Sequence, residues 1–205
     1  ELTGADRRDG VYTFLIFAST DNVNADTIMV ATIDIPNSKI GIMSIPRDTR
    51  VSTNRAGVKK INGGLTRGVE NLKKEIASII GFTPDFYVDV ELEGFITLID
   101  TVGGVDFDVP RDMNYDDDTQ NLHIHFEAGY QHLDGQAAME LLRYRNDNGY
   151  SAGYDDYGRM ETQQAFLVAL AKKMCTPQNL LKIGDYVNIY LENVETDLTA
   201  GNLAW

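Results

Sequence analysis

The sequence predicts a single mixed α/β domain over residues 1–205, with three α/β/α layers, a mixed central sheet and a small hairpin. Three observations lead to this fold class. Segments rich in β-branched and aromatic residues are interspersed with segments whose apolar residues recur at helical spacing. Neither a linker nor an internal repeat interrupts the 205 residues. The hydrophobic share of 43% and the charged share of 24% are typical of globular proteins.

The first part of the chain is apolar and β-branched or aromatic at most positions, which predicts three consecutive strands. These strands are Val11–Ser19, Thr27–Ile35 and Lys39–Ile45. Pro46 has no N–H to donate to a sheet, so it ends the third strand. Arg47 is therefore expected in a loop, at the mouth of that strand.

The rest of the chain predicts helices alternating with further strands. A helix over Leu65–Ile80 has apolar residues at helical spacing and Gly81 as its stop signal. The remaining strands are expected at Asp85–Glu91 and Val105–Val109, with a hairpin over Tyr115–Phe126. The remaining helices are expected at Leu92–Val102, Gly135–Tyr144, Asp156–Met174 and Leu180–Glu192, and Thr196–Thr199 is typical of a helix start.

The charge balance argues against nucleic-acid binding. Lys and Arg total 18 against 31 Asp and Glu, a formal net charge of −13, whereas a duplex-binding protein needs a basic footprint. A local basic cluster could still bind phosphate. Cys175 is the single cysteine, so an intrachain disulfide is excluded, and no apolar run reaches the roughly 18 residues of a membrane span.

Asp21 and Asp26 form an acidic pair between the first two predicted strands. Two carboxylates on one short loop can share a hard cation such as Mg²⁺, which prefers oxygen ligands and phosphates. Asp, Asn and Thr in this loop can also simply form and cap a turn. On the residues alone, the turn is the commoner outcome.

The segment from Ser44 to Arg50 delivers Arg47 at the end of a buried strand, a usual place for function in an open α/β sheet. Arginine can form two parallel hydrogen bonds to phosphate and stays charged when desolvated. A surface ion pair of Arg47 with Asp48 is the alternative, worth about 0–1 kcal/mol.

A second basic group follows near the end of the chain. Arg143 and Arg145 lie at the end of a predicted helix, where cations also complement the helix dipole. Arg159 and Gln163 are four residues apart on one face of the next helix, near the helix start that favours anions. Together these residues could form a pyrophosphate cradle.

Other candidate sites are weaker. His123 and His125 alternate along a strand and could bind a metal, but no Cys or third His completes that site, so a surface pair on the hairpin is favoured. The run from Tyr115 to Asp118 lacks the Gly and terminal Glu of an EF-hand loop and is interpreted as a solvated turn.

Several motifs along the chain occur in the order seen in the LytR-CpsA-Psr (LCP) family, and the resemblance covers nearly the whole sequence. The motifs are Asp26-Thr27-Ile28-Met29, Ser44-Ile45-Pro46-Arg47-Asp48-Thr49, Lys60-Ile61-Asn62, Gly103-Gly104-Val105, the run from Gly129 to Gly135, Arg143-Tyr144-Arg145 and Asp156-Tyr157-Gly158-Arg159. Each motif alone is weak, but the combination is specific.

The resemblance implies an α/β/α fold behind an N-terminal membrane anchor, which we expect upstream of this chain, on the extracellular face of the cytoplasmic membrane of a Gram-positive bacterium. It also implies a phosphotransferase that moves a wall glycopolymer, such as wall teichoic acid or capsular polysaccharide, from a polyprenyl-pyrophosphate carrier to peptidoglycan. In the family, Mg²⁺ and a set of arginines hold the pyrophosphate, and an apolar pocket takes the polyprenyl tail.

Carried over residue by residue, the resemblance assigns the metal to Asp21 and Asp26 and the pyrophosphate to the arginines and the site glutamine. Those residues are Arg47, Arg143, Arg145, Arg159 and Gln163, with Asp21, Asp26 and Arg47 as the catalytic set. An acceptor hydroxyl would attack the sugar-side phosphorus, and polyprenyl phosphate would leave.

Two positions depart from the family pattern. This chain has Asn24 two residues before the aspartate of the Asp-Thr motif and Thr162 directly before the site glutamine, where the family often has arginines. These departures keep two alternatives open: a non-catalytic domain that binds the lipid-linked polymer as a sensor or scaffold, and a hydrolase that passes the same phosphate to water.

Overall fold

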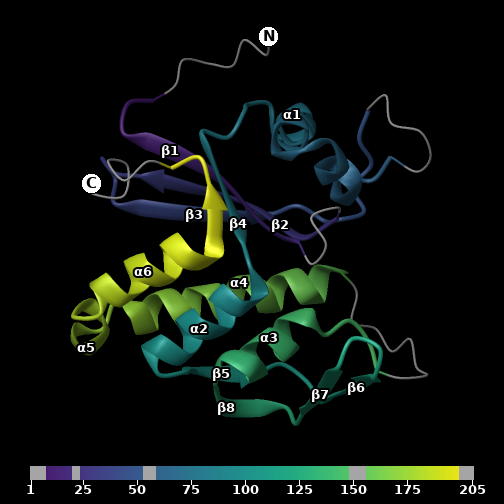
Figure 1. Cartoon of the computed structure of the whole chain (residues 1–205), viewed down its shortest axis with the longest axis vertical. Helices are drawn as coiled ribbons and strands as arrows, with labels where there is room; N and C mark the ends of the chain where they lie inside the picture. The colour runs from purple at the N-terminus through teal and green to yellow at the C-terminus, as the bar shows by residue number, and fades with distance from the viewer. Residues whose placement is uncertain (1–7, 20–23, 53–58, 148–155, 199–205) are drawn as a thin grey trace. The chain divides into compact units, whose positions relative to one another are not determined.

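The computed structural model describes residues 8–19, 24–52, 59–147 and 156–198, which form two compact units. Unit 1 comprises residues up to Glu91 together with the segment from Val194 onward, and unit 2 comprises Leu92–Asn193. Figure 1 shows the elements of both units. None of the described helices is both long and apolar enough to cross a membrane.

Unit 1 is built on a five-stranded mixed sheet in the order β3-β2-β1-β4-β9. Strands β1–β2, β2–β3 and β4–β9 pair antiparallel, whereas β1 and β4 pair parallel. The elements of this unit are β1 (Val11–Ser19), β2 (Ala25–Asp34), β3 (Lys39–Ser44), the 3₁₀ helix η1 (Ile61–Arg67), α1 (Val69–Ile80), β4 (Phe86–Val90) and β9 (Val194–Thr196).

Helix α1 covers one face of this sheet. Leu15 on β1 lies opposite Val30 on β2, and both pack with Leu72 and Ile76 of α1 in one buried cluster. The other face is also apolar, since Phe14, Ala31 and Ile42 follow one another across β1, β2 and β3 in register. The sheet is therefore apolar on both faces, a pattern expected of strands meant for burial rather than for an open surface.

Unit 2 contains helices and two small antiparallel sheets, one formed by β5 and β8 and the other by the β6–β7 hairpin. Its elements are α2 (Leu92–Val102), β5 (Val105–Val109), β6 (Met113–Asp117), β7 (Leu122–Phe126), β8 (Gly129–Leu133), α3 (Gly135–Arg143), α4 (Asp156–Met174), α5 (Pro177–Leu180) and α6 (Ile183–Asn193).

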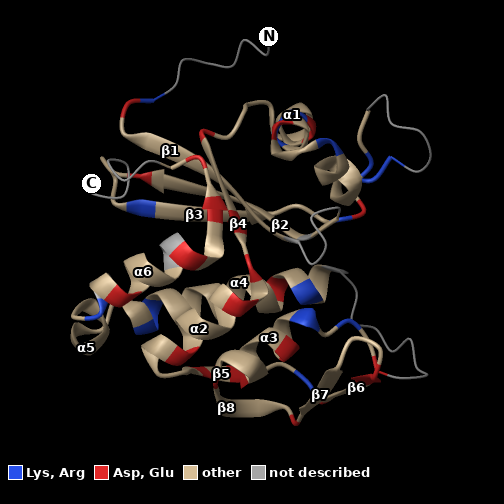
Figure 2. Cartoon of the chain, viewed as in Figure 1, with Lys and Arg blue, Asp and Glu red and all other residues tan. Residues whose placement is uncertain are grey.

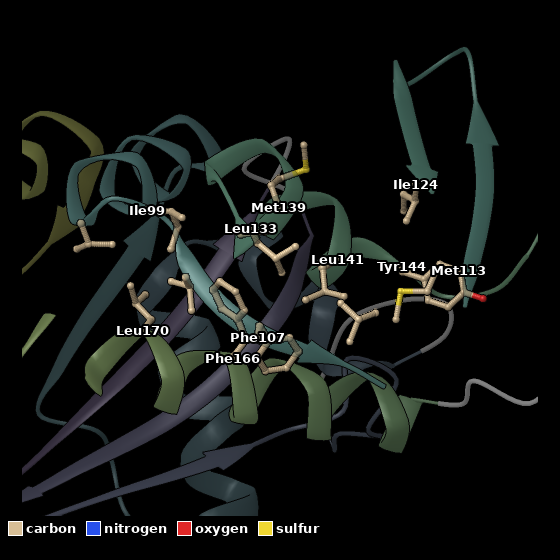
Figure 3. Packing of buried hydrophobic residues seen from close by; sticks show 14 of the residues in the cluster. Ile99, Phe107, Met113, Ile124, Leu133, Met139, Leu141, Tyr144, Phe166 and Leu170 are labelled. Carbon is tan, nitrogen blue, oxygen red and sulfur yellow. The ribbon is translucent and has the colours of Figure 1, made fainter. Parts of the chain in front are cut away.

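The core of unit 2 is continuous from its helices to its small sheets. Phe166 of α4 is fully buried and packs edge-on against Phe107 of β5, with the ring centroids 5.4 Å apart. Figure 3 shows the same cluster extending to Tyr144 and to Ile124 of the hairpin. The hairpin is therefore anchored by its inward side chains, while the residues between them face solvent.

The mixed α/β class, the mixed sheet and the small hairpin predicted from the sequence are confirmed. The helix predicted from Leu65 is shorter, because Gly68 has a φ of 87° and separates η1 from α1. The predicted helix over Leu180–Glu192 is divided into α5 and α6. Thr196 does not start a helix but lies in β9, where it pairs with Val88.

Candidate functional site

The predicted metal aspartates belong to the hairpin formed by β1 and β2. Asp21 lies outside the described residues, and of Asp26 only the backbone is described. Ala18 pairs with Thr27 and Ser19 pairs with Ala25, so Asp26 is the extra residue of a β-bulge. Bulges bend a strand and are frequent beside active sites. Among the described residues, no group of three or more His, Cys, Asp or Glu side chains is suited to hold a metal.

Arg47 lies in a loop whose backbone is tightly held, as the position of Pro46 predicts. The Ile45 N–H donates to the carbonyl oxygen of Ile28 at 2.8 Å, which continues the β2–β3 pairing just beyond β3. The Thr49 N–H donates to the carbonyl of Pro46 at 2.9 Å, and the Asn62 N–H donates to the carbonyl of Arg47 at 3.1 Å. These bonds fix the chain at Arg47 without involving its side chain.

The Arg47 side chain is 22% exposed and lies beside Asp48, with Nε 3.8 Å from Oδ1. Lys60 approaches the other oxygen of the same carboxylate, with Nζ 2.6 Å from Oδ2. The ion pair weighed as an alternative for Arg47 is thus present, but Asp48 is shared between two cations and the nearer one is Lys60. Two positive charges therefore lie beside one carboxylate, and a guanidinium in this position can also bind an anionic ligand. Lys60 belongs to the Lys60-Ile61-Asn62 motif, but its pairing with Asp48 was not predicted.

Asp26 and Arg47 lie at the same end of the β2–β3 pair. The last ladder pair before this end is Met29 with Ser44, and the two strands run antiparallel. Asp26 precedes Met29 on one strand, and Arg47 follows Ser44 by the same number of residues on the other. The register therefore brings the two predicted site positions of unit 1 to the same end of the sheet.

In unit 2, Gln163 joins the end of α3 to the first turns of α4. Its Nε2 donates to the carbonyl oxygen of Leu142 at 3.2 Å. This carbonyl belongs to the last turn of α3, where carbonyl groups have no N–H partner within the helix. Gln163 and Arg159 are both buried, at 6% and 7% exposure, and they share one face of α4. The four-residue spacing therefore places Arg159 and Gln163 on one face of α4, as the sequence predicts, and Gln163 joins this face to the end of α3.

Arg143 is the last residue of α3, and Arg145 is exposed in the segment that follows. This segment is held by Asp147, whose Oδ1 accepts from the buried Tyr144 hydroxyl at 2.8 Å and from the Asn114 N–H at 2.7 Å. The backbone bond from Asn114, followed by the Tyr144 hydroxyl, lowers the pKa of Asp147. Figure 2 shows basic residues, in blue, on α4 and at the end of α3.

The structure thus assembles the predicted site residues into two groups, one in each unit. Asp26 and Arg47 belong to unit 1, whereas Arg143, Arg145, Arg159 and Gln163 lie around the α3–α4 junction of unit 2. That the two groups converge on one cleft stays a prediction. Sequence reasoning missed Asp147, which bonds to Tyr144 within the segment after α3, and Gln120, which contacts Arg143 from the β6–β7 hairpin. Neither residue lies in a sequence pattern that reveals its partner.

The two histidines considered as a metal pair lie on the exposed face of the β6–β7 hairpin. His123 Nδ1 and His125 Nε2 are 2.7 Å and 3.1 Å from the same oxygen of Asp116, Oδ1. The hydrogen bond to Asp116 raises the pKa of His123. A surface cluster held by its own hydrogen bonds agrees with the favoured interpretation from sequence.

Comparison with known proteins gives a consistent result. A model of the LytR_cpsA_psr family matches residues 2–205. The chain is 34% identical, over 179 residues, to the polyisoprenyl-teichoic acid–peptidoglycan teichoic acid transferase TagV of Bacillus subtilis (strain 168), covering 85% of this chain and 45% of TagV. It is 32% identical, over 204 residues, to the transferase TagU of Bacillus mycoides (strain KBAB4), covering 97% of this chain and 59% of TagU.

The fold agrees as well. The crystal structure of B. subtilis TagV superposes with a TM-score of 0.75 at 30% identity, over 96% of this chain and 77% of that one. The chain spans about half the length of the curated relatives it matches.

Proposed function

This chain belongs to the LytR-CpsA-Psr family, and we propose from that premise that it transfers a teichoic-acid-type glycopolymer from a polyprenyl-pyrophosphate carrier to peptidoglycan. The match over residues 2–205 carries the proposal. The names of TagV and TagU, which state this donor class and this acceptor, support it. We propose further that both units work as one catalytic domain, on the outer face of the cytoplasmic membrane of a Gram-positive bacterium.

The arginines of both units bind the pyrophosphate of the donor. Arg159 is buried near the start of α4, where backbone N–H groups and the helix dipole favour an anion. Gln163 keeps the end of α3, and with it Arg143, beside that helix start. Arg47 supplies a guanidinium from a loop whose backbone does not have to move. Fixed cations of this kind stabilise charge that develops on phosphoryl oxygens.

Asp21 and Asp26 would hold the Mg²⁺ ion. Both come from one hairpin, whose strands are paired up to Ser19 and Ala25, and carboxylate oxygens are the ligands that Mg²⁺ prefers. The donor set therefore fits the ion. When bound, Mg²⁺ neutralises charge on the phosphate oxygens.

The transfer is an in-line displacement at phosphorus. The acceptor hydroxyl oxygen on peptidoglycan forms a bond to the sugar-side phosphorus, and the bond from that phosphorus to the bridging oxygen breaks. Polyprenyl phosphate leaves with the bridging oxygen. An aspartate of the β1–β2 hairpin takes the proton of the acceptor hydroxyl, and the arginines hold the two phosphates in line.

The apolar tail of the carrier needs an apolar surface, because burial of such a chain stabilises the complex by about 25 cal/mol per Å². The sheet face opposite α1 is apolar across three strands, with Phe14, Ala31 and Ile42 in register. Ile40, on the edge strand β3, is 73% exposed. We propose this face as part of the tail-binding surface.

One experiment separates the proposal from its two alternatives. The chain is incubated with a lipid-linked glycopolymer donor and Mg²⁺, with and without a peptidoglycan acceptor, and polymer linked to peptidoglycan, free polymer phosphate and polyprenyl phosphate are measured. Transfer that depends on the acceptor supports the proposal. Equal release of polyprenyl phosphate without the acceptor identifies a hydrolase, and binding without any turnover identifies a sensor or scaffold domain.

A further inference from the structure

The turn of the β6–β7 hairpin reaches Arg143, one of the proposed pyrophosphate arginines. Arg143 Nη2 donates to Oε1 of Gln120 at 2.7 Å, and these residues are 23 positions apart. The same guanidinium lies 3.9 Å, through Nη1, from the sulfur of Met139. Among the described residues, Gln120 is the polar side chain from outside α3 that bonds to Arg143.

The orientation of the Gln120 amide follows from its two partners. Its Nε2 donates to Oδ2 of Asp117 at 2.6 Å, while its Oε1 faces Arg143. A carboxylate can only accept and a guanidinium can only donate, so the amide has one satisfactory orientation between them. The result is a chain of hydrogen bonds from Asp117 through Gln120 to Arg143.

The turn that carries this chain is itself well fixed. The other oxygen of Asp117, Oδ1, accepts from the Thr119 hydroxyl and from the backbone N–H groups of Thr119 and Gln120. Asn121 completes the turn with a φ of 47°, in the left-handed region that Asn tolerates. Gln120 therefore projects from a local structure with little freedom, which makes it a suitable support for another side chain.

A neutral partner holds an arginine in place without cancelling its charge. Within the described residues, no carboxylate forms an ion pair with Arg143, whereas Arg47 lies beside Asp48. A carboxylate at position 120 would compete with a phosphate for the same guanidinium, but an amide oxygen leaves the full positive charge available. We propose that Gln120 is a positioning residue for the donor site, which orients Arg143 toward the pyrophosphate. This inference rests on the proposed function.

The test measures binding of geranylgeranyl pyrophosphate, in the presence of Mg²⁺, to the whole chain. Gln120→Ala removes the support and is expected to weaken binding about tenfold, because a misaimed guanidinium loses its two parallel bonds to phosphate. Gln120→Glu places a negative charge against Arg143 and is expected to weaken binding about ten- to hundredfold. This second loss should shrink as salt is raised, because salt screens exposed charges. The ratio of the binding affinities of Gln120→Ala and the unchanged protein should not depend on the salt concentration.

Gln178 offers a matched control. It is an exposed glutamine on α5, which follows the end of α4, whereas Arg143 lies beside the start of α4. Gln178→Ala and Gln178→Glu make the same chemical changes and should bind the probe normally. Arg143→Ala should weaken binding, and adding Gln120→Ala to it should cause no further loss.

The outcomes keep the two proposals apart. If Arg143→Ala weakens binding while the Gln120 variants behave like their Gln178 counterparts, the positioning role is wrong and the proposed function stands. If Arg143→Ala binds the probe normally, the donor site itself is misassigned, and the role of Gln120 falls with it. Thermal unfolding midpoints equal to that of the unchanged chain show that the variants are folded.

Discussion

Asp26 and Arg47 lie at one end of the β2–β3 ladder, each beyond the pair formed by Met29 and Ser44. A proposed metal ligand and a proposed phosphate ligand thus come from neighbouring strands whose register is set by backbone hydrogen bonds. Their proximity does not depend on either side chain, so each can be replaced while the sheet around it is retained.

We expect one pyrophosphate to be contacted by both groups of site residues. A crystal structure with a pyrophosphate-bearing lipid should place Arg47 of unit 1 and Arg159 of unit 2 within hydrogen-bonding distance of the same pyrophosphate. Phosphate-suited residues at a strand end and at a helix start are the reason for this expectation. A pyrophosphate held by unit 2 with Arg47 pointing to solvent would contradict the site.

Arg47→Ala should nearly abolish transfer and leave the fold intact. Loss of one aimed donor to developing negative charge costs roughly 10²–10³ in rate, whereas the long ion pair of Arg47 with Asp48 is worth about 0–1 kcal/mol of stability. Arg47→Lys should restore only part of the rate, because an ammonium cannot give two parallel bonds. Transfer rate and melting temperature are measured on the same samples, with Arg67→Ala, an exposed arginine at the end of η1, as control. A much lower melting temperature in Arg47→Ala alone would make Arg47 a structural ion-pair residue.

Removal of divalent cations with a chelator should stop transfer, and added Mg²⁺ should restore it. Asp26→Asn should raise the Mg²⁺ concentration needed for half-maximal rate and weaken Mn²⁺ binding measured by electron paramagnetic resonance, because an amide is a poorer ligand for a hard cation. Asp34→Asn removes the same charge from the far end of β2, where Asp34 binds Asn37, and should change neither quantity. Equal Mn²⁺ binding by both variants would remove Asp26 from the metal site.

Asp197→Ala should lower the free energy of unfolding by about 2 kcal/mol. Asp197 accepts from the buried Lys73 ammonium at 3.1 Å and from the Tyr87 N–H at 2.8 Å, so its loss removes a hydrogen-bond acceptor from both donors. Asp197→Asn keeps an acceptor for Tyr87 and should cost less. Glu70 lies 3.9 Å from the same ammonium but is largely exposed, so Glu70→Ala should change stability by less than about 0.5 kcal/mol. Urea unfolding measures the stability of all three variants, and equal losses in Asp197→Ala and Glu70→Ala would contradict the stabilising role of Asp197.

His123 should titrate above its ordinary pKa of 6.5, because its hydrogen bond to Asp116 favours the protonated ring. The stabilisation from His123 is fully present below 6.5 and is lost as pH rises through the raised pKa. The same bond lowers the pKa of Asp116 from 3.8, so the stabilisation from Asp116 is lost only as pH falls through that lowered value. Asp116→Asn should bring the NMR titration midpoint of His123 down, whereas Asp108→Asn on β5 should not. A midpoint that stays raised in Asp116→Asn would assign the shift to another group.

Local patterns in the sequence predict the regular elements well, and partners distant in sequence explain the differences. Val11–Ser19, predicted from its run of apolar, β-branched and aromatic residues, agrees with the structure, and so do the helices Leu92–Val102 and Asp156–Met174. The segment from Thr196 has residues typical of a helix start. Thr196 is nevertheless in a strand, because it pairs with Val88 at the edge of β4. Gly68 breaks the predicted helix because its backbone adopts a positive φ, which periodicity does not reveal.

In the candidate site, too, local sequence patterns predict some features, whereas contacts between distant residues could not be predicted. The position of Arg47 in a loop follows from Pro46 alone, and the shared face of Arg159 and Gln163 follows from their spacing. Gln120 could not be found in this way. Its partner Arg143 is brought near by the packing of the hairpin, and no short-range pattern encodes that contact.

The pairing of β4 with β9 bears on how the protein is made. Thr196 bonds to the carbonyl of Tyr87, 109 positions earlier in the chain. During translation, every residue of Leu92–Asn193 therefore leaves the ribosome before the last strand of the five-stranded sheet exists. Unit 2 can acquire its own core before β9 is available, while β4 has one unpaired edge. Closing so long a loop is entropically costly, so the pairing of β9 with β4 is expected late in the assembly of the five-stranded sheet.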